Sequence, residues 1–254
     1  TAAPQNDEGS KMNAFGITDK GKVRSVNQDS YHLSVSPGGD YVLAALCDGM
    51  GGVHGGEIAS TIAADSFMQY AEDMLCREPA SDAAQILREA AAYANLKVYD
   101  RAFRDDACRG MGTTLVAALV RPDDAAVVNI GDSRCYWLAD GQLQQVTRDH
   151  SLVQSMVDRG LITEEEACSH PRKNVIMRAV GLERTIRSDI FRLDIRSGDA
   201  LLLCSDGLSN LVSTGEMEAL LLTSSDDDAL CRELLRMALE RGAPDNVTLA
   251  LVRR

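Results

Sequence analysis

Apolar residues recur along the chain in short runs, most of which have the length and composition of strands. Several of these runs are apolar throughout, which is typical of strands buried on both faces. Two short connections, Pro122-Asp123-Asp124 and Asp140-Gly141, predict antiparallel hairpins rather than parallel crossovers. The predicted strands are residues 13–18, 31–35, 41–47, 113–120, 125–130, 135–138, 189–193, 200–204 and 247–252.

Three longer segments place apolar side chains at helical spacing and predict helices that cover these sheets. They are residues 56–74, 82–104 and 226–241. Ser81 is the expected N-cap of the second helix. Three aspartates begin the third, where they suit the positive end of the helix dipole. The pattern therefore indicates an α+β fold with buried antiparallel sheets and covering helices.

The chain shows no repeat and no low-complexity segment, and we expect one domain over residues 11–254. Residues 1–10 are polar and are expected to be a flexible segment outside the fold. Residues 149–187 do not continue the pattern of strands and long helices; they carry many charges and short helical segments. We interpret them as an excursion from the core. Such a segment is more often a surface variation than a functional lid, although long loops near active sites tend to set substrate choice.

Composition excludes several kinds of function. The chain has 38 acidic against 26 basic residues, a net charge of −12, which disfavours a nucleic-acid partner or an anionic membrane surface. The apolar runs fall far short of the roughly 18 residues that cross a bilayer. Seven scattered cysteines without a CxxC pair suggest neither a disulfide framework nor a zinc site. Free thiols favour a reducing cytoplasm.

Four aspartates lie at the ends of apolar runs. Asp48, Asp132 and Asp206 each follow such a run, and Asp245 directly precedes one. An antiparallel neighbour that enters the sheet at Asp245 would bring it to the same edge as the other three. The sequence therefore predicts that these carboxylates converge.

Two interpretations of these aspartates compete. AspGly is a common turn dipeptide, so each site taken alone is typical of a turn. Clustered carboxylates, however, repel one another and need cations or protons to coexist. Magnesium and manganese prefer oxygen ligands, and a pair of such ions can clamp a displacement at phosphorus. The cluster favours metal-dependent hydrolysis of a phosphoester.

The chain carries a set of short motifs in order from about residue 13 to 252. They are Arg24 with Asn27-Gln28-Asp29, CDGMGG at 47–52 with Gly56-Glu57 and Ala59-Ser60, MGTT at 111–114, GDSRCY at 131–136, TRDHS at 147–151, SDGL at 205–208 and DN at 245–246. No single motif is specific, but the order of the whole set and the span that it covers are specific. In this order and span the chain resembles the metal-dependent phosphatases related to protein phosphatase 2C.

The resemblance implies a two-sheet antiparallel β-sandwich flanked by helices on both faces, an αββα sandwich. It also implies two Mn²⁺ or Mg²⁺ ions. Asp48 would bridge both metals, Gly49 would offer its carbonyl oxygen, and Asp206 and Asp245 would bind the second metal. The nucleophile would be a water that bridges the metals.

Further roles follow from the same resemblance. Asp29 would act through bound water, and Asp132 together with Asp206 matches the position of a third ion in bacterial members. Arg24 would bind the phosphate, which suits a planar guanidinium. The excursion would be a flap beside the catalytic channel, where Arg172 and Lys173 form a basic group.

Two positions depart from the eukaryotic pattern. Gln28 stands where an acidic residue is common, and Met50 stands where a histidine often serves as general acid. The source of the proton for the leaving group is therefore open. His54 and His150 lie in or near the motifs, but a structural or exposed histidine is the simpler interpretation of both.

The expected activity is hydrolysis of phosphoserine and phosphothreonine in proteins, by a monomer in a bacterial cytoplasm. Its substrates would be targets of a partner Ser/Thr protein kinase. One rival is a catalytically silent pseudophosphatase that acts as a regulatory module, although no metal aspartate is lost. A metal-dependent nuclease is disfavoured by the acidic balance. A cysteine phosphatase would need a CxxxxxR loop, which the chain lacks.

Overall fold

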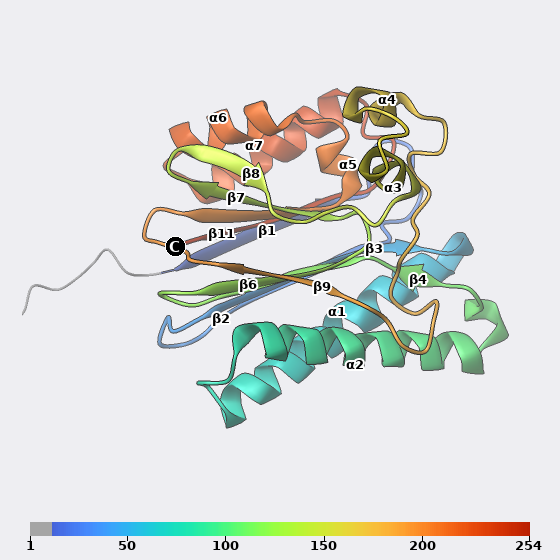
Figure 1. Cartoon of the computed structure of the whole chain (residues 1–254), viewed down its shortest axis with the longest axis horizontal. Helices are drawn as coiled ribbons and strands as arrows, with labels where there is room; N and C mark the ends of the chain where they lie inside the picture. The colour runs from blue at the N-terminus through green and yellow to red at the C-terminus, as the bar shows by residue number, and fades with distance from the viewer. Residues whose placement is uncertain (1–11) are drawn as a thin grey trace, which may run out of the picture.

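A computed structural model describes residues 12–254, without the side chains of residues 52–54. It has four layers, with two antiparallel sheets face to face and helices outside both (Figure 1). The predicted αββα sandwich is therefore confirmed. The flexible segment predicted for residues 1–10 lies outside the described residues.

The first sheet joins the two ends of the described chain, because its strand order is β1-β11-β10-β7-β8. Every neighbouring pair is antiparallel. Its strands are β1 (Asn13–Asp19), β7 (Arg134–Ala139), β8 (Gln142–Gln145), β10 (Ala200–Cys204) and β11 (Val247–Arg253).

The second sheet has the order β2-β3-β5-β6-β9, again with antiparallel neighbours. Its sixth strand, β4, lies off this order and pairs with the end of β3. The strands are β2 (Asp29–Val35), β3 (Val42–Met50), β4 (Gly112–Thr113), β5 (Leu115–Val120), β6 (Ala125–Ile130) and β9 (Asp189–Leu193).

Each sheet carries its own helices on its outer face, as Figure 1 shows. Helices α1 (Gly52–Arg77) and α2 (Ala83–Arg104) cover the second sheet, and the short 3₁₀ helix η1 (Asp106–Cys108) follows them. Helices α5 (Asp206–Ser209), α6 (Thr214–Thr223) and α7 (Asp227–Glu240) cover the first sheet. Helices α3 (Leu152–Asp158) and α4 (Glu164–Ser169) belong to the excursion.

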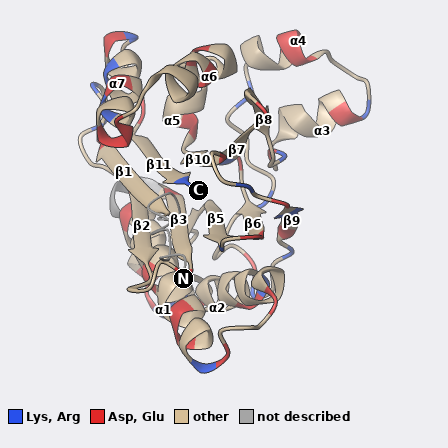
Figure 2. Cartoon of the chain, turned by 90° about the vertical axis from the view of Figure 1, so that its left-hand side faces the viewer, with Lys and Arg blue, Asp and Glu red and all other residues tan. Residues whose placement is uncertain are grey.

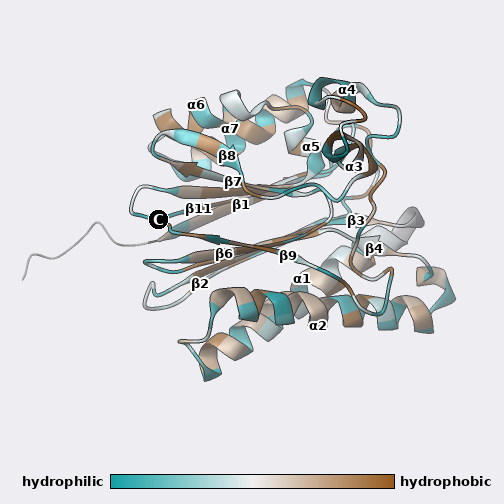
Figure 3. Cartoon of the chain, in the orientation of Figure 1, coloured by the Kyte–Doolittle hydropathy of each residue, from teal (hydrophilic) through white to brown (hydrophobic). Residues whose placement is uncertain are grey.

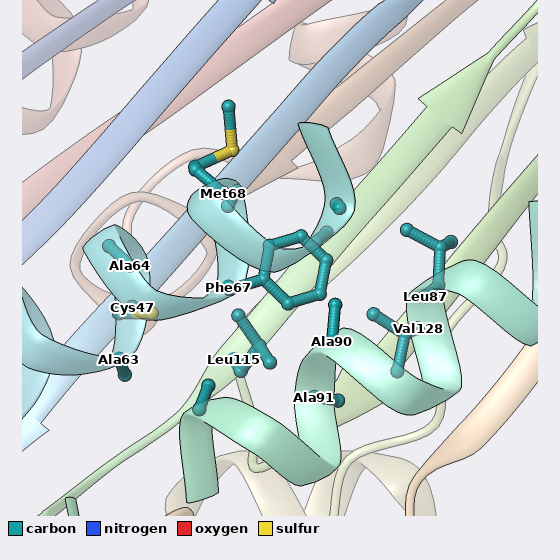
Figure 4. Packing of buried hydrophobic residues seen from close by; sticks show 14 of the residues in the cluster. Cys47, Ala63, Ala64, Phe67, Met68, Leu87, Ala90, Ala91, Leu115 and Val128 are labelled. Atoms are coloured by element: carbon teal, nitrogen blue, oxygen red, sulfur yellow. The ribbon is translucent and has the colours of Figure 1, made fainter. Parts of the chain in front are cut away.

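Three apolar layers hold these elements together. The middle layer lies between the sheets and includes Leu46, Val116, Leu201 and Ala250. The strands β5, β6 and β10 are buried at every position, whereas β8 at the sheet edge is mostly exposed and shows teal in Figure 3. Many of the charged residues lie on the helices (Figure 2). In the layer below, Phe67 of α1 reaches toward α2 (Figure 4). Such burial of apolar surface is the main term that stabilises the fold.

The three predicted helices exist, and their stripes are core as expected. Ala59, Ala63 and Phe67 of α1 are fully buried, and so are Leu234 and Ala238 of α7. The N-cap predicted at Ser81 is wrong, because the carboxylate of Asp82 accepts the bond from the Ala84 N–H. Asp82 is the better cap, since it lies directly before the first helical residue.

Sequence patterns missed strand β8, helices α5 and α6, and the 3₁₀ helix η1. Strand β8 contains a single apolar residue, Leu143, between glutamines, so no alternation marks it. Helix α6 begins with a capping box of Ser213 and Glu216, a signal that could have found it. The predicted strand 113–120 is two strands, because Thr114 interrupts the pairing. No helix among residues 12–254 is long and apolar enough to cross a membrane.

Candidate metal centre

The five predicted aspartates meet at one edge shared by the two sheets. Asp29 begins β2 and pairs in register with Asp48 near the end of β3. Asp206 is the first residue of α5, directly after β10, and Asp245 lies two residues before β11. Asp132 follows β6. Burial raises the pKa of Asp48, and the charges of the other four aspartates raise it further, so all five carboxylates lie near one another at this edge.

Hydroxyl groups from the opposite sheet fix Asp29. Ser205 Oγ donates to Asp29 Oδ2 at 2.9 Å, and Thr248 Oγ1 donates to the same oxygen at 2.6 Å. The backbone N–H of Thr248 donates to Ser205 Oγ at 3.0 Å. Since Asp29 belongs to one sheet and both hydroxyls to the other, these bonds tie the sheets together at the site.

Glycines beside the aspartates allow close backbone approach. A Cβ on Gly207 would lie 1.9 Å from the carbonyl oxygen of Asn246, and one on Gly49 would lie 2.1 Å from that of Gly56. Neither Gly49 nor Gly207 is among the described glycines with a positive φ. Gly49 lies within β3 and Gly207 within α5, so the interpretation of these two AspGly pairs as turns is wrong: the glycines let two segments touch.

The site concentrates buried negative charge. Burial, with smaller contributions from neighbouring carboxylates, raises the pKa of both Asp29 and Asp132 to about 7 and that of Asp206 to about 6. The same causes raise the pKa of Asp48 well above its usual value. Buried carboxylates this close together need bound protons or cations to share one sheet edge.

Arg24 supplies part of that compensation. Its Nη2 donates to Asp245 Oδ2 at 2.7 Å, and its side chain is 54% exposed. The charges of Asp48 and Asp206 also raise the pKa of Arg24. The guanidinium therefore lies at the solvent side of the carboxylate cluster.

The donor set fits a hard divalent cation. Among residues 12–254 no three His, Cys, Asp or Glu side chains are already arranged to hold a metal. Arg24 occupies one oxygen of Asp245, and hydroxyls occupy one oxygen of Asp29. Asp29 Oδ1, however, is buried without a hydrogen-bond partner in the described structure, which is costly unless a ligand satisfies it. Carboxylate oxygens are the ligands that Mg²⁺ and Mn²⁺ prefer.

Several polar residues of the site were not assigned a role from the sequence. Thr114, Ser133, Ser205 and Thr248 are all fully buried, and their hydroxyls bond one another or the backbone and side chains of the aspartates. Asn246 accepts a bond from the Gln28 N–H and donates to two carbonyls, which fixes the loop before β2. Ser133 and Ser205 stand directly beside Asp132 and Asp206 in the sequence, a signal that could have found them, whereas Thr114 and Thr248 adjoin no aspartate.

A polar cavity of about 440 Å³ opens beside Asp132 and Asp206. Its opposite wall comes from the excursion, including Glu164, Cys168 and Lys173. His150 joins the excursion to the edge, because its Nδ1 accepts from the Gly131 N–H at 3.0 Å. Its side chain is 8% exposed, as a structural histidine would be. The side chain of His54 lies outside the described residues.

Residues 20–248 match the family described as protein phosphatase 2C. The chain belongs to this family. It is 35% identical over 243 residues to the serine/threonine phosphatase stp of Listeria welshimeri, and the match covers 96% of each chain.

Solved structures of the protein phosphatase 2C family agree with this architecture. The chain superposes with a TM-score of 0.86 on the Mycobacterium tuberculosis serine/threonine phosphatase PstP/Ppp, at 36% identity, over 95% of this chain and 98% of that one. It superposes with a TM-score of 0.84 on the catalytic domain of PstP in complex with two manganese ions, at 35% identity, over 95% and 97%.

Proposed function

We propose that this chain is a metal-dependent phosphatase that hydrolyses phosphoserine and phosphothreonine in proteins. The observation that carries the proposal is the cluster of five aspartates at one sheet edge, where a buried carboxylate oxygen has no partner among the described residues. The family supports it, because relatives that match nearly the whole chain are serine/threonine phosphatases.

We assign the metal-binding roles to residues of this edge. Asp48 would contact both ions, with the carbonyl of Gly49 beside it, and Asp206 and Asp245 would hold the second ion. When bound, such ions supply Lewis-acid activation of water and neutralise charge on the phosphoryl oxygens. The hydroxyl bonds to Asp29 hold one of its oxygens in place and leave the other for a water or an ion.

Arg24 would bind the phosphoryl group. Its exposed guanidinium can engage two phosphoryl oxygens at once, and it currently bonds only Asp245 among the described acids. Phosphate binding would therefore compete with this ion pair and release the Asp245 oxygen for the metal. Met50 offers no proton to the leaving group, so that role stays unassigned.

We propose that Asp132 and Asp206 hold a third, weaker ion, and that Mg²⁺ can replace Mn²⁺. We further propose that residues 11–254 form one domain and that residues 149–187 serve as a flap that selects substrates. The cavity between the flap and the aspartates supports this role, since residues around the phosphorylated side chain would pass through it.

The cellular setting is also a proposal. We infer a monomer in a bacterial cytoplasm that acts on proteins phosphorylated by a partner Ser/Thr kinase. All seven cysteines lie in the described chain as free thiols, which suits a reducing compartment. Light scattering of the purified protein tests the monomer, and phosphoproteome changes on deletion test the substrates.

One assay tests the function itself. The protein should release phosphate from a phosphothreonine peptide with Mn²⁺, lose this activity with chelator, and regain it when Mn²⁺ is restored. A pseudophosphatase would bind the peptide without release of phosphate. Equal turnover with and without chelator would contradict the metal-dependent mechanism.

A further inference from the structure

Thr114 lies at the centre of a buried polar contact that links Asp48 to the loop of Asp132. Its backbone N–H donates to the carbonyl of Asp48 at 2.9 Å, and its Oγ1 accepts from the N–H of Asp48 at 2.9 Å. Thr114 therefore bonds both backbone groups of Asp48, and the hydroxyl of Thr113 also donates to the Asp48 carbonyl, at 2.9 Å. These bonds form where β5 has not yet begun, so regular strand pairing does not supply them.

The same hydroxyl reaches the loop that carries Asp132. Thr114 Oγ1 and Ser133 Oγ lie 2.7 Å apart, and both residues have no exposed surface. Since Thr114 Oγ1 already accepts a hydrogen bond from the backbone N–H of Asp48, its own O–H can donate to Ser133 Oγ. Ser133 directly follows Asp132, and so the polar link runs from the backbone of one aspartate to the neighbour of the other.

The methyl group of Thr114 makes a second contact with this loop. A Cβ on Gly131 would lie 2.6 Å from Thr114 Cγ2 and 2.7 Å from Thr114 Cβ. Gly131 also has φ of 110°, a conformation that side chains rarely adopt. Thr114 thus touches the residues on both sides of Asp132, one through its methyl group and one through its hydroxyl.

We propose that Thr114 is a positioning residue that couples the orientation of Asp48 to that of Asp132. The proposal rests on the proposed metal-binding function. Through this coupling, occupancy of the third-ion position at Asp132 would steady Asp48, and a disturbed Asp132 loop would loosen it. Removing a residue that orients a metal ligand typically weakens metal binding about 10- to 100-fold.

Two substitutions separate the hydroxyl from the methyl group. Thr114→Val keeps the shape and removes the hydroxyl, which leaves the Asp48 N–H without its acceptor. Thr114→Ser keeps the hydroxyl and removes the methyl group. Thr147→Val is a matched control, because Thr147 is also buried and its hydroxyl also accepts a backbone N–H, that of Cys135.

Calorimetric titration with Mn²⁺ is the primary measurement, with melting of the metal-free proteins as the test of folding. We expect Thr114→Val to bind Mn²⁺ about 10- to 100-fold more weakly than the wild type. Thr114→Ser should recover most of this loss, and Thr147→Val should stay within roughly twofold of the wild type. Ser133→Ala keeps both bonds between Thr114 and Asp48. It should weaken only the part of Mn²⁺ binding that Asp132→Asn also removes.

The outcomes distinguish the two proposals. If the wild type neither binds Mn²⁺ nor releases phosphate, the proposed function fails. If the wild type does both and folded Thr114→Val binds Mn²⁺ equally well, the coupling is refuted. Equal losses in Thr114→Ser and Thr114→Val would also refute it, because a variant that keeps the hydroxyl would then bind Mn²⁺ no better than one that lacks it. Should Thr114→Val not fold, the comparison of Ser133→Ala with Asp132→Asn decides.

Discussion

Asp48 is held on both sides of its backbone by Thr114, whereas helix α4 of the excursion buries no residue at all. The sheet edge consists of strand ends fixed by buried hydroxyls. The excursion exposes apolar side chains such as Leu161 and Met177, at 64% and 60%. It is anchored near its ends by single bridges, Ser151 to Ile176 and Thr113 to Val180.

This contrast separates two tasks. Groups that must keep a fixed geometry lie on elements that packing makes rigid, which is where sites are most accurately built. A segment with little buried surface can change its sequence or its position at small cost, because it contributes little to the core. The edge is therefore suited to the chemistry, and the excursion to the choice of substrate.

The largest expected effect tests whether the chemistry resides entirely at the edge. Asp48→Asn should lower turnover of a phosphothreonine peptide by at least about a thousandfold, because a loss of several kcal/mol of charge stabilisation has that effect on rate. Phosphate release and Mn²⁺ titration measure it. Asp40→Asn, in an exposed turn, should behave as the wild type; substantial activity of Asp48→Asn would place the chemistry elsewhere.

A smaller effect is expected from Arg24, which contacts the edge from the solvent side. Arg24→Ala should raise the KM about 10- to 100-fold, since charged hydrogen bonds are worth about 1.5–3 kcal/mol. The metals should still bind, because no metal ligand is lost. If Arg24→Ala abolished Mn²⁺ binding while Asp48→Asn did not, the two assignments would be reversed.

A third test concerns the excursion. Lys173 is exposed and lines the cavity opposite Asp206. Lys173→Ala should change turnover of phosphopeptides by up to about fivefold, as exposed charge pairs are worth up to about 1 kcal/mol, and should leave a small aryl phosphate unaffected. Lys97→Ala on the outer face of α2 is the control. Equal effects on both substrates would show that the excursion is only structural.

The smallest effect concerns the junction of the two regions, where His150 Nε2 also contacts Asp189 Oδ2 at 3.1 Å. Burial lowers the pKa of His150 below its usual value of about 6.5, because the charged ring is poorly solvated. The neutral ring therefore adds stability above that value, and this contribution is lost as the pH falls through the lowered pKa.

His150→Phe removes both ring nitrogens and keeps a ring. Urea unfolding should show a loss of about 1–3 kcal/mol at pH 7.5, from the unpaired Gly131 N–H, and a smaller difference from the wild type at pH 5. Comparing His150→Phe with the wild type at the same pH cancels the contribution that the carboxylates common to both proteins make to the free energy of unfolding. A difference that grows toward pH 5 would contradict a neutral buried His150, and His32→Phe, at an exposed histidine, is the control.

Much of the fold was readable because its signals are local. The predicted ranges of β6, β9 and β10 coincide with the structure. In β6 and β10 a mostly apolar run marks a strand that is buried at every position. Strand β8 was missed because glutamines around Leu143 carry no periodic signal. The cap of α2 was misplaced by one residue, which is the usual error at helix ends.

The sequence by itself determined which aspartates lie at the ends of buried strands, and hence which carboxylates meet at one edge. Only the tertiary structure decided what holds them. Asp29 and Thr248 are 219 residues apart, and Asp48 and Thr114 are 66 apart, yet each pair shares a hydrogen bond. The periodicity of apolar residues fixes local structure and burial, whereas contacts between segments distant in sequence depend on how strands pair and how the two sheets pack, which no local pattern encodes.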